Sequence, residues 1–160
     1  MGEERESGFS HLDAIGRARM VDVSEKAVTR REAEASCRVR LSAETVGRLE
    51  TLPKGDAYSV SRLAGIQAAK RAADLVPLAH PLPLDHVEVS LEPDGDGILI
   101  TTRVVVQART GAEIEAMAGC AGAALALYDM VKAIERDATI TDWRLERKSG
   151  GRSGTFRRGS

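Results

Sequence analysis

The sequence predicts an α+β protein in which helices pack on one face of an antiparallel sheet, preferably in the ferredoxin-like arrangement. Three observations predict it. Strand and helix patterns follow each other in the order strand, two helices, strand, strand, helix, strand. The turn sequence PDGDG at 93–97 joins two alternating segments into a hairpin, which makes those strands antiparallel. The chain has 160 residues, which suits one domain with a buried core.

The first half of the chain is predicted to hold one strand and two helices. The elements are a strand over 27–42, a helix over 43–52, a turn at 53–56 and a helix over 58–75. Apolar side chains alternate with arginines at the end of the strand, and Ser42 is a suitable N-cap for the first helix. The second helix is expected to face the core with Val60, Leu63, Ala64, Ala68 and Ala72.

The second half is predicted to hold a hairpin, a long helix and a last strand. The elements are strands over 86–92 and 98–108, a helix over 111–136 and a strand over 139–148. Thr110 and Glu113 fit a capping box at the helix start. Residues 118–124 are all small, and each glycine inside a helix costs about 1 kcal/mol relative to alanine. Close approach of another backbone would offset that cost.

The predicted organisation is a disordered N-terminus over 1–10, one domain over 11–148 and a flexible, glycine-rich basic segment over 149–160. A net charge of −1 and 3% aromatic residues argue against binding of nucleic acid. The polar N-terminus does not resemble a signal peptide, and no apolar run approaches the roughly 18–20 residues of a membrane span. Two distant cysteines predict reduced thiols and a cytoplasmic protein.

The segment VPLAHPLPLDH at 76–86 places His80 among three prolines. Because proline fixes its own φ and restricts the residue before it, this loop is rigid without secondary structure. Rigid loops often carry functional groups, and the alternative is a stiff connector whose histidine fills space. His80 and His86 lack the spacing of a helical ligand pair and a third ligand is not evident, so no metal site is predicted.

Charged residues elsewhere have a functional and a structural interpretation each. Asp129 lies in an apolar stretch three residues before Lys132, which makes the pair either a surface ion pair or an acid/base carboxylate beside a cation. Lys54 lies in an exposed turn, and Lys148 precedes a glycine-rich loop of the kind that wraps phosphates or is simply a basic tail. Helix capping explains Glu113 but leaves Glu115 without a structural role.

The predicted long helix separates two of these candidates. Glu113 and Asp129 on one straight helix lie about 24 Å apart at 1.5 Å per residue. One small substrate does not span that distance. We therefore expect an oligomer in which the helix start of one subunit meets the helix end of another.

Taken together, these motifs resemble the cyclic pyranopterin monophosphate synthase family, an accessory enzyme family of molybdenum cofactor biosynthesis. The resemblance covers about residues 20–154. Six blocks carry it: MVDVSEKAVTRREA (20–33), KGD (54–56), RLAGIQAAKRAADLVPLAHPLPL (62–84), TGAEIEAM (110–117), ALYDMVKAIERD (126–137) and KSGGRSG (148–154). It implies a lyase that converts a cyclic dihydro-GTP intermediate, supplied by a radical SAM enzyme, into cyclic pyranopterin monophosphate with release of pyrophosphate.

The resemblance also implies a ferredoxin-like homo-hexamer, a trimer of dimers with sites at subunit interfaces. No cofactor is predicted, and the sequence leaves open whether a divalent metal accompanies the triphosphate. The catalytic positions of the family fall on Asp129, Lys132, Lys54 and Lys148. Its substrate-contacting segments fall on Leu78, Ala79, His80, Glu113, Ile114 and Glu115. Ala79 departs from relatives that have cysteine there, which leaves the backbone contacts intact. The alternatives are a non-catalytic nucleotide-binding or RNA-binding module and a regulatory small-molecule domain.

Overall fold

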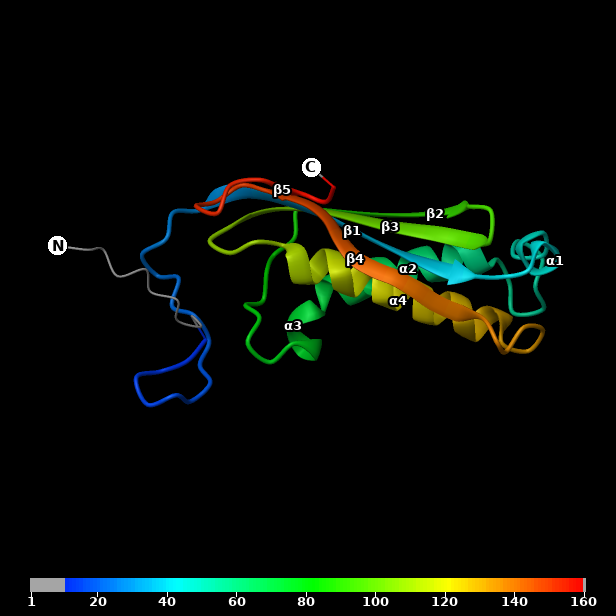
Figure 1. The fold of residues 1–160 in the computed structure, drawn as a ribbon, viewed down its shortest axis with the longest axis horizontal. Helices are drawn as coiled ribbons and strands as arrows, with labels where there is room; N and C mark the ends of the chain where they lie inside the picture. The colour runs from blue at the N-terminus through cyan, green and yellow to red at the C-terminus, as the bar shows by residue number, and fades with distance from the viewer. Residues whose placement is uncertain (1–10, 160) are drawn as a thin grey trace.

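The computed structural model describes residues 11–159, so the predicted disorder of residues 1–10 falls outside the described residues. These residues form five strands and four helices (Figure 1). The strands are β1 (Thr29–Arg40), β2 (His86–Pro93), β3 (Gly97–Ala108), β4 (Thr139–Ser149) and β5 (Phe156–Arg157). The helices are α1 (Ala43–Val46), α2 (Ala57–Lys70), α3 (Ala72–Leu75) and α4 (Glu113–Val131).

The strands form one antiparallel sheet in the order β2-β3-β1-β4-β5. Alternate residues of β1 and β3 are buried, as the strand patterns predicted, and Ala33, Cys37 and Val39 lie on the covered face. The α+β class is therefore confirmed. The four long strands, with β1 and β3 in the interior of the sheet, are compatible with the ferredoxin-like arrangement, which stays a prediction. Two register shifts interrupt the β1–β4 ladder and twist β4.

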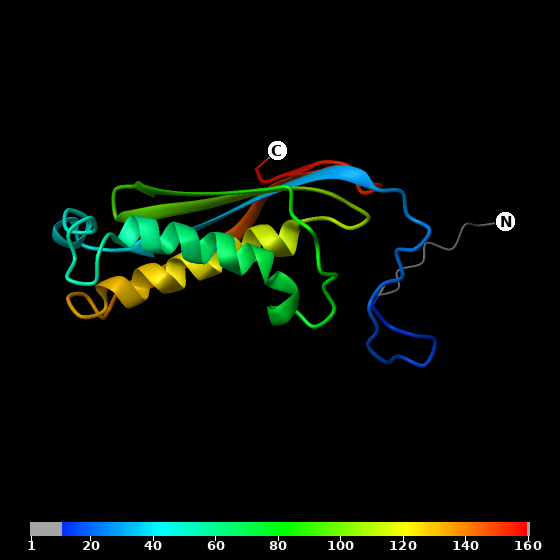
Figure 2. The same ribbon diagram turned by 180° about the vertical axis from the view of Figure 1, so that it is seen from behind.

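Helices α2 and α4 lie side by side against one face of the sheet, as Figures 1 and 2 show from opposite sides. Small residues permit this close packing, as predicted for 118–124. A Cβ added at Gly65 would lie 2.9 Å from the Gly119 carbonyl oxygen, and one at Gly122 would overlap the Ala68 methyl. The packing that offsets the helical glycines therefore comes from α2 and β3 of the same chain.

The face of α2 that enters the core differs from the prediction. Its buried positions are Ala57, Ser61, Gly65 and Ala69. Val60 and Leu63, which were expected inside, are exposed, with Leu63 at 68%. The α4 helix sits so close that only small side chains fit between the two helices, and the larger residues turn outward.

All three predicted helices also differ from the structure in their boundaries. The first helix ends at Val46, before Gly47, and the second divides into α2 and α3 at Arg71, whose φ of −115° is not helical. The long helix starts at Glu113 after Ala112 without a side-chain cap, so Thr110 does not form the predicted capping box. It ends at Val131 rather than 136. Glu135 instead accepts bonds from the Ser42 N–H and hydroxyl, which ties that turn to the end of β1.

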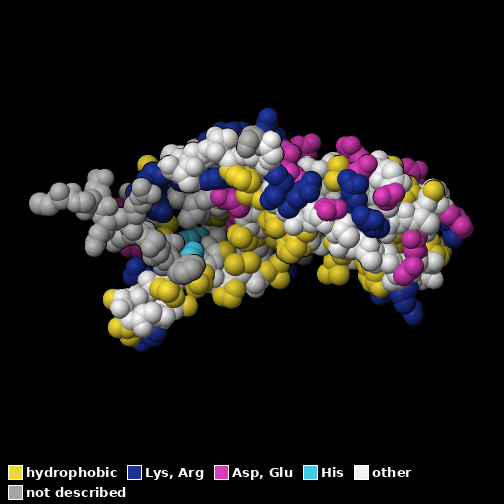
Figure 3. Space-filling view, viewed as in Figure 1, with side chains coloured by type: hydrophobic (Ala, Val, Ile, Leu, Met, Phe, Trp, Pro, Cys, Tyr) yellow, Lys and Arg dark blue, Asp and Glu magenta, His cyan; other side chains and the backbone are white. Residues whose placement is uncertain are grey.

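The open face of the sheet carries an ion-pair network in place of a second apolar layer. The Glu32 carboxylate is buried and pairs with Arg103, Arg147 and Arg30 at 2.8 to 3.1 Å. These bonds, with that of Arg103 foremost, lower the pKa of Glu32 to about 2. Figure 3 shows charges of both signs interspersed on the sheet side and hydrophobic side chains gathered over α4 and β4.

A short edge strand and an apolar helix complete the description of the fold. Within the segment predicted to be flexible, β5 pairs with Arg147 and Lys148 of β4. The α4 helix is long and apolar enough to cross a membrane by length and composition, contrary to the prediction that no stretch would be. More than half of its apolar window is buried against the sheet and α2, and the core helices of many globular proteins meet the same criteria, so this is weak evidence for a membrane span.

Candidate functional site

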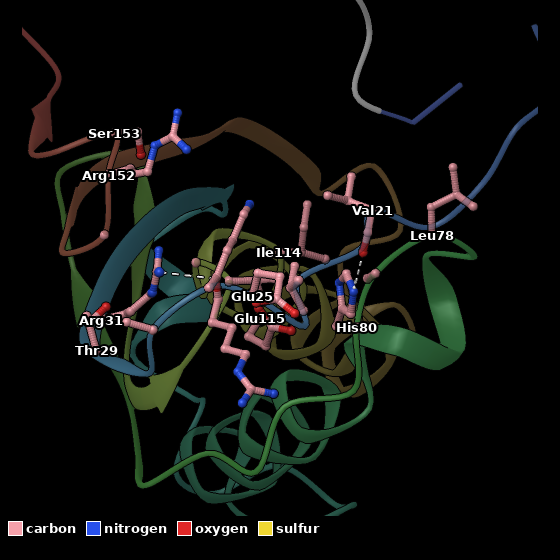
Figure 4. Close-up of a pocket in the computed structure, with 18 of the residues that line it drawn as sticks. Val21, Glu25, Thr29, Arg31, Leu78, His80, Ile114, Glu115, Arg152 and Ser153 are labelled. Atoms are coloured by element: carbon pink, nitrogen blue, oxygen red, sulfur yellow. Dashed lines mark hydrogen bonds between the residues drawn. The ribbon is translucent and has the colours of Figure 1, made fainter. Parts of the chain in front are cut away.

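A large pocket opens where the N-terminal segment, the start of α4 and the C-terminal loop meet. Its volume is about 920 Å³. Figure 4 shows Glu115 between Arg31 on one side and His80 on the other, with Arg152 above. The lining residues fall into three groups. Apolar and small ones include Val21, Val23, Leu78, Ala79 and Ile114; cations are Lys26, Arg31, Arg109 and Arg152; the carboxyl groups are Glu25 and Glu115.

The proline-rich loop supplies one wall of this pocket. No regular secondary structure occurs between α3 and β2, as the prolines predicted, and Leu78, Ala79 and His80 line the cavity. The His80 ring donates from Nε2 to the Val21 carbonyl oxygen at 2.9 Å, shown as a dashed line in Figure 4. Because a carbonyl only accepts, Nε2 carries the proton in this hydrogen bond.

Glu115 supplies a buried carboxyl at the base of the pocket. It lies in the first turn of α4 and is 4% exposed. Burial raises the pKa of Glu115 to about 7, with a contribution from the nearby Glu113 carboxylate. A carboxyl with this pKa exchanges protons readily at neutral pH. Glu115 also borders a second, smaller pocket beside the end of α2 and Pro81–Pro83.

The other predicted residues at this end have different surroundings. Ile114 lines the pocket and is 40% exposed. Glu113 and Lys148 lie beside it without lining it. The Lys148 ammonium hydrogen-bonds the Ser153 hydroxyl and lies 4.0 Å from the Glu113 carboxylate, so the β4 end is tied to the α4 start.

The pocket cations Lys26, Arg31 and Arg109 were not singled out in the sequence. They come from the N-terminal segment, β1 and the end of β3, and only the tertiary structure places them together with Arg152. One signal was available, since Arg109 precedes the TGAE block and Arg31 lies in the TRRE block. Together they give the cavity a cationic lining suited to phosphate groups.

The remaining predicted residues form a separate cluster at the far end of α4. The Lys132 ammonium lies 2.7 Å from Asp129 Oδ1, and the Lys54 ammonium donates to Asp129 Oδ2 at 3.2 Å and to its carbonyl oxygen at 2.9 Å. Hydrogen bonds from Lys132 first and Lys54 second lower the pKa of Asp129. Its side chain is 55% exposed, so this charged triad faces the surface.

One chain does not bring all the predicted site residues together. The α4 helix is continuous from Glu113 to Val131, and none of Lys54, Asp129 and Lys132 lines the large pocket. The two groups lie about 24 Å apart along the helix axis. Among residues 11–159, no three His, Cys, Asp or Glu side chains cluster closely enough to hold a metal ion.

Comparison with known proteins agrees with the motifs. Residues 20–151 match the model of the MoaC family. The chain is 51% identical over 152 residues to the cyclic pyranopterin monophosphate synthase of Streptomyces griseus, covering 94% of this chain and 86% of the relative. It is 49% identical over 154 residues to the protein of the same name from Dinoroseobacter shibae, covering 94% and 98%. This chain is therefore a member of the MoaC family.

Proposed function

We propose that this protein is a cyclic pyranopterin monophosphate synthase of molybdenum cofactor biosynthesis. Its substrate is the cyclic dihydro-GTP intermediate, and its products are cyclic pyranopterin monophosphate and pyrophosphate. The observation that carries this proposal is a pocket that combines four cations with a buried carboxyl in a MoaC-family chain. Relatives about half identical over 94% of the chain bear the name of this activity.

The pocket chemistry suits the proposed cyclisation. A ribose hydroxyl oxygen bonds to the α-phosphorus, the bond from that phosphorus to the bridging oxygen breaks, and pyrophosphate leaves. The hydroxyl proton passes to a base, and cations stabilise the charge that develops on the leaving group. The cations Lys26, Arg109 and Arg152 line the same cavity, which supports a role for them in that stabilisation. Remodelling of the purine-derived ring needs further proton transfers, for which a carboxyl titrating near neutrality is suited.

The complete site is assembled from two subunits of a homo-hexamer, a trimer of dimers. His80 and Glu115 hold the base and sugar, with contacts from Leu78, Ala79, Ile114 and Glu113. Asp129 and Lys132 of a neighbouring subunit transfer protons, and Lys54 and Lys148 serve the phosphates or a proton. Two facts support this arrangement: the separation along α4, and the exposure of the Asp129 cluster, which leaves it accessible to another subunit.

The context of the reaction follows from its substrate. A radical SAM enzyme supplies the cyclic dihydro-GTP, and no cofactor or metal is assigned to this chain. We place the reaction in the cytoplasm, and the two free thiols Cys37 and Cys120 agree with a reducing compartment.

The test is product formation by the purified protein. The protein is incubated with GTP, the radical SAM enzyme and its cofactors, and the pterin product is detected by chromatography. Asp129→Asn should abolish turnover while the oligomer stays intact by light scattering. Asp96→Asn, in the exposed hairpin turn, is the matched control and should keep turnover. Near-normal turnover by Asp129→Asn would refute its role. Substrate binding without product by the unmodified protein would favour a non-catalytic binding module.

A further inference from the structure

Arg31 makes an unusual set of contacts for a pocket cation. It lies on β1, and its guanidinium reaches the end of β3, where Nε donates to the Ala108 carbonyl oxygen and Nη2 to that of Arg109, both at 3.1 Å. No carboxylate of residues 11–159 forms an ion pair with it. Arg31 thus uses its hydrogen bonds to hold main-chain carbonyls at the point where β3 leads into α4.

The same guanidinium supports a second loop. A Cβ added at Gly151 would overlap Arg31 Nη1 and lie 2.6 Å from Cζ, so the backbone of the C-terminal loop rests directly on the guanidinium. Gly151 has a φ of +75°, which favours glycine independently of this contact. The neighbouring Gly150 leaves just enough room for the Arg30 carbonyl.

Both of these loops contribute lining residues to the pocket. The β3–α4 connection presents Thr110 and Gly111 and leads directly into the helical turn that holds Glu115. The C-terminal loop presents Arg152 and Ser153. Figure 4 shows Arg31 below Arg152 and Ser153, with its hydrogen bond to the Arg109 carbonyl oxygen dashed.

We propose that Arg31 is a positioning residue of this enzyme: its guanidinium fixes the β3–α4 connection against the loop at 150–153, and so sets the places of Glu115 and Arg152. This inference rests on the proposed function. Arginine suits the task because its planar fork places two donors toward successive carbonyls, which the single ammonium of lysine does not reproduce. The competing role is that of a cation bound directly to substrate phosphates.

Arg31→Lys separates these roles, since it keeps the charge and loses the fork. For a positioning residue we expect kcat to fall at least about tenfold, with KM within about threefold of the unmodified value. Hydrogen exchange at the amides of 109–112 and 150–153 should accelerate, with the melting temperature nearly unchanged. An increase in KM with kcat preserved would assign Arg31 to the substrate phosphates and overturn the proposal. Unchanged kcat, KM and hydrogen-exchange rates would also overturn it.

Gly151→Ala tests the same contact with Arg31 left in place. Its matched control is Gly154→Ala, because Gly154 also has a positive φ, +65°, and nothing lies within 4 Å of an added Cβ. We expect Gly151→Ala to lower kcat and loosen both loops, and Gly154→Ala to do neither. Equal effects of the two substitutions would attribute the loss to backbone strain and contradict the proposal.

The exchange measurements also separate this inference from the proposed function. If the unmodified protein forms no pterin product, the proposed function fails on that result alone. Faster exchange in both loops of Arg31→Lys would still support the structural part of the inference. Unchanged hydrogen exchange in Arg31→Lys would refute the inference, whatever the activity of the variant.

Discussion

Glu115 combines deep burial with a place in the pocket, and its protonation couples the site to stability. The unfolded carboxyl loses its proton near pH 4.5, whereas the folded one keeps its proton until about pH 7. Folding therefore loses stability as the pH rises from 4.5 to 7, and the full penalty applies above pH 7. Burial of this carboxyl therefore lowers the stability of the protein at neutral pH, and it gives the site a group that titrates at the working pH.

Glu115→Gln should remove that penalty. We expect the variant to be more stable than the unmodified protein at pH 8, on the order of 3 kcal/mol, and equally stable at pH 4. Turnover should fall at both pH values because an amide does not transfer the proton. Urea unfolding at the two pH values measures the stability, with the exposed Glu44→Gln as control for the amide itself. A stability gain of the same size at pH 4 and pH 8 would contradict the assignment.

At the same scale, sequence and structure differ in which site residues they identify. The motif blocks point to His80, Glu115 and Asp129, because each lies in a short stretch with unusual chemistry. Lys26 and Arg31 have no such local signal. Arg31 hydrogen-bonds a backbone carbonyl about 80 residues away, and Lys26 lines a cavity whose other walls come from distant segments. Only the fold therefore assigns these two residues to the pocket.

At the scale of elements, the contact between α2 and α4 depends on glycine. Gly122 costs helix stability, yet an added Cβ there would overlap the Ala68 methyl and lie 3.0 Å from the Ala64 carbonyl oxygen. A clash with a backbone atom is not relieved by a side-chain rotation, so the two helices would have to separate.

Gly122→Ala should therefore destabilise the protein by about 1–3 kcal/mol, although alanine is the better helix former. Adding Ala68→Gly removes the methyl–methyl overlap, and the double variant should regain part of the loss. Thermal unfolding of the two single variants and the double variant measures the coupling between the positions. Strict additivity of the two single effects would show that the helices do not meet at this point.

The same packing explains where element prediction succeeded and where it failed. The four long strands were predicted to within two residues at each end, because alternation in β1 and β3 follows directly from one covered face, whereas the short strand β5 was not predicted. The core face of α2 was mispredicted, because the helical periodicity of the apolar residues places Val60 and Leu63 on the buried face. The close approach of α4 instead selects Ser61, Gly65 and Ala69, whose advantage is small volume.

At the scale of the whole molecule, α4 acts as a spacer that holds two charged groups at opposite ends. One end has the cationic pocket, and the other has an exposed aspartate between two lysines. An isolated subunit therefore contains only one of the two residue groups of the proposed active site at either end of α4. Because a two-fold interface repeats the same contacts on both sides, two subunits that each place the start of α4 against the end of the other's α4 would create two equivalent complete sites.

Mixed oligomers test this directly. Asp129→Asn and His80→Ala damage opposite ends, so each variant alone should be inactive or nearly so. After the two variants are unfolded together and reassembled, random pairing leaves about a quarter of the sites with both ends intact, and that share of activity should return. Asp129→Asn mixed with Lys132→Ala is the control, because both damage the same end and no intact site can form. Native mass spectrometry verifies that subunits have mixed. Mixed particles without recovered activity, or a fully active monomer by light scattering, would show that one subunit holds the whole site.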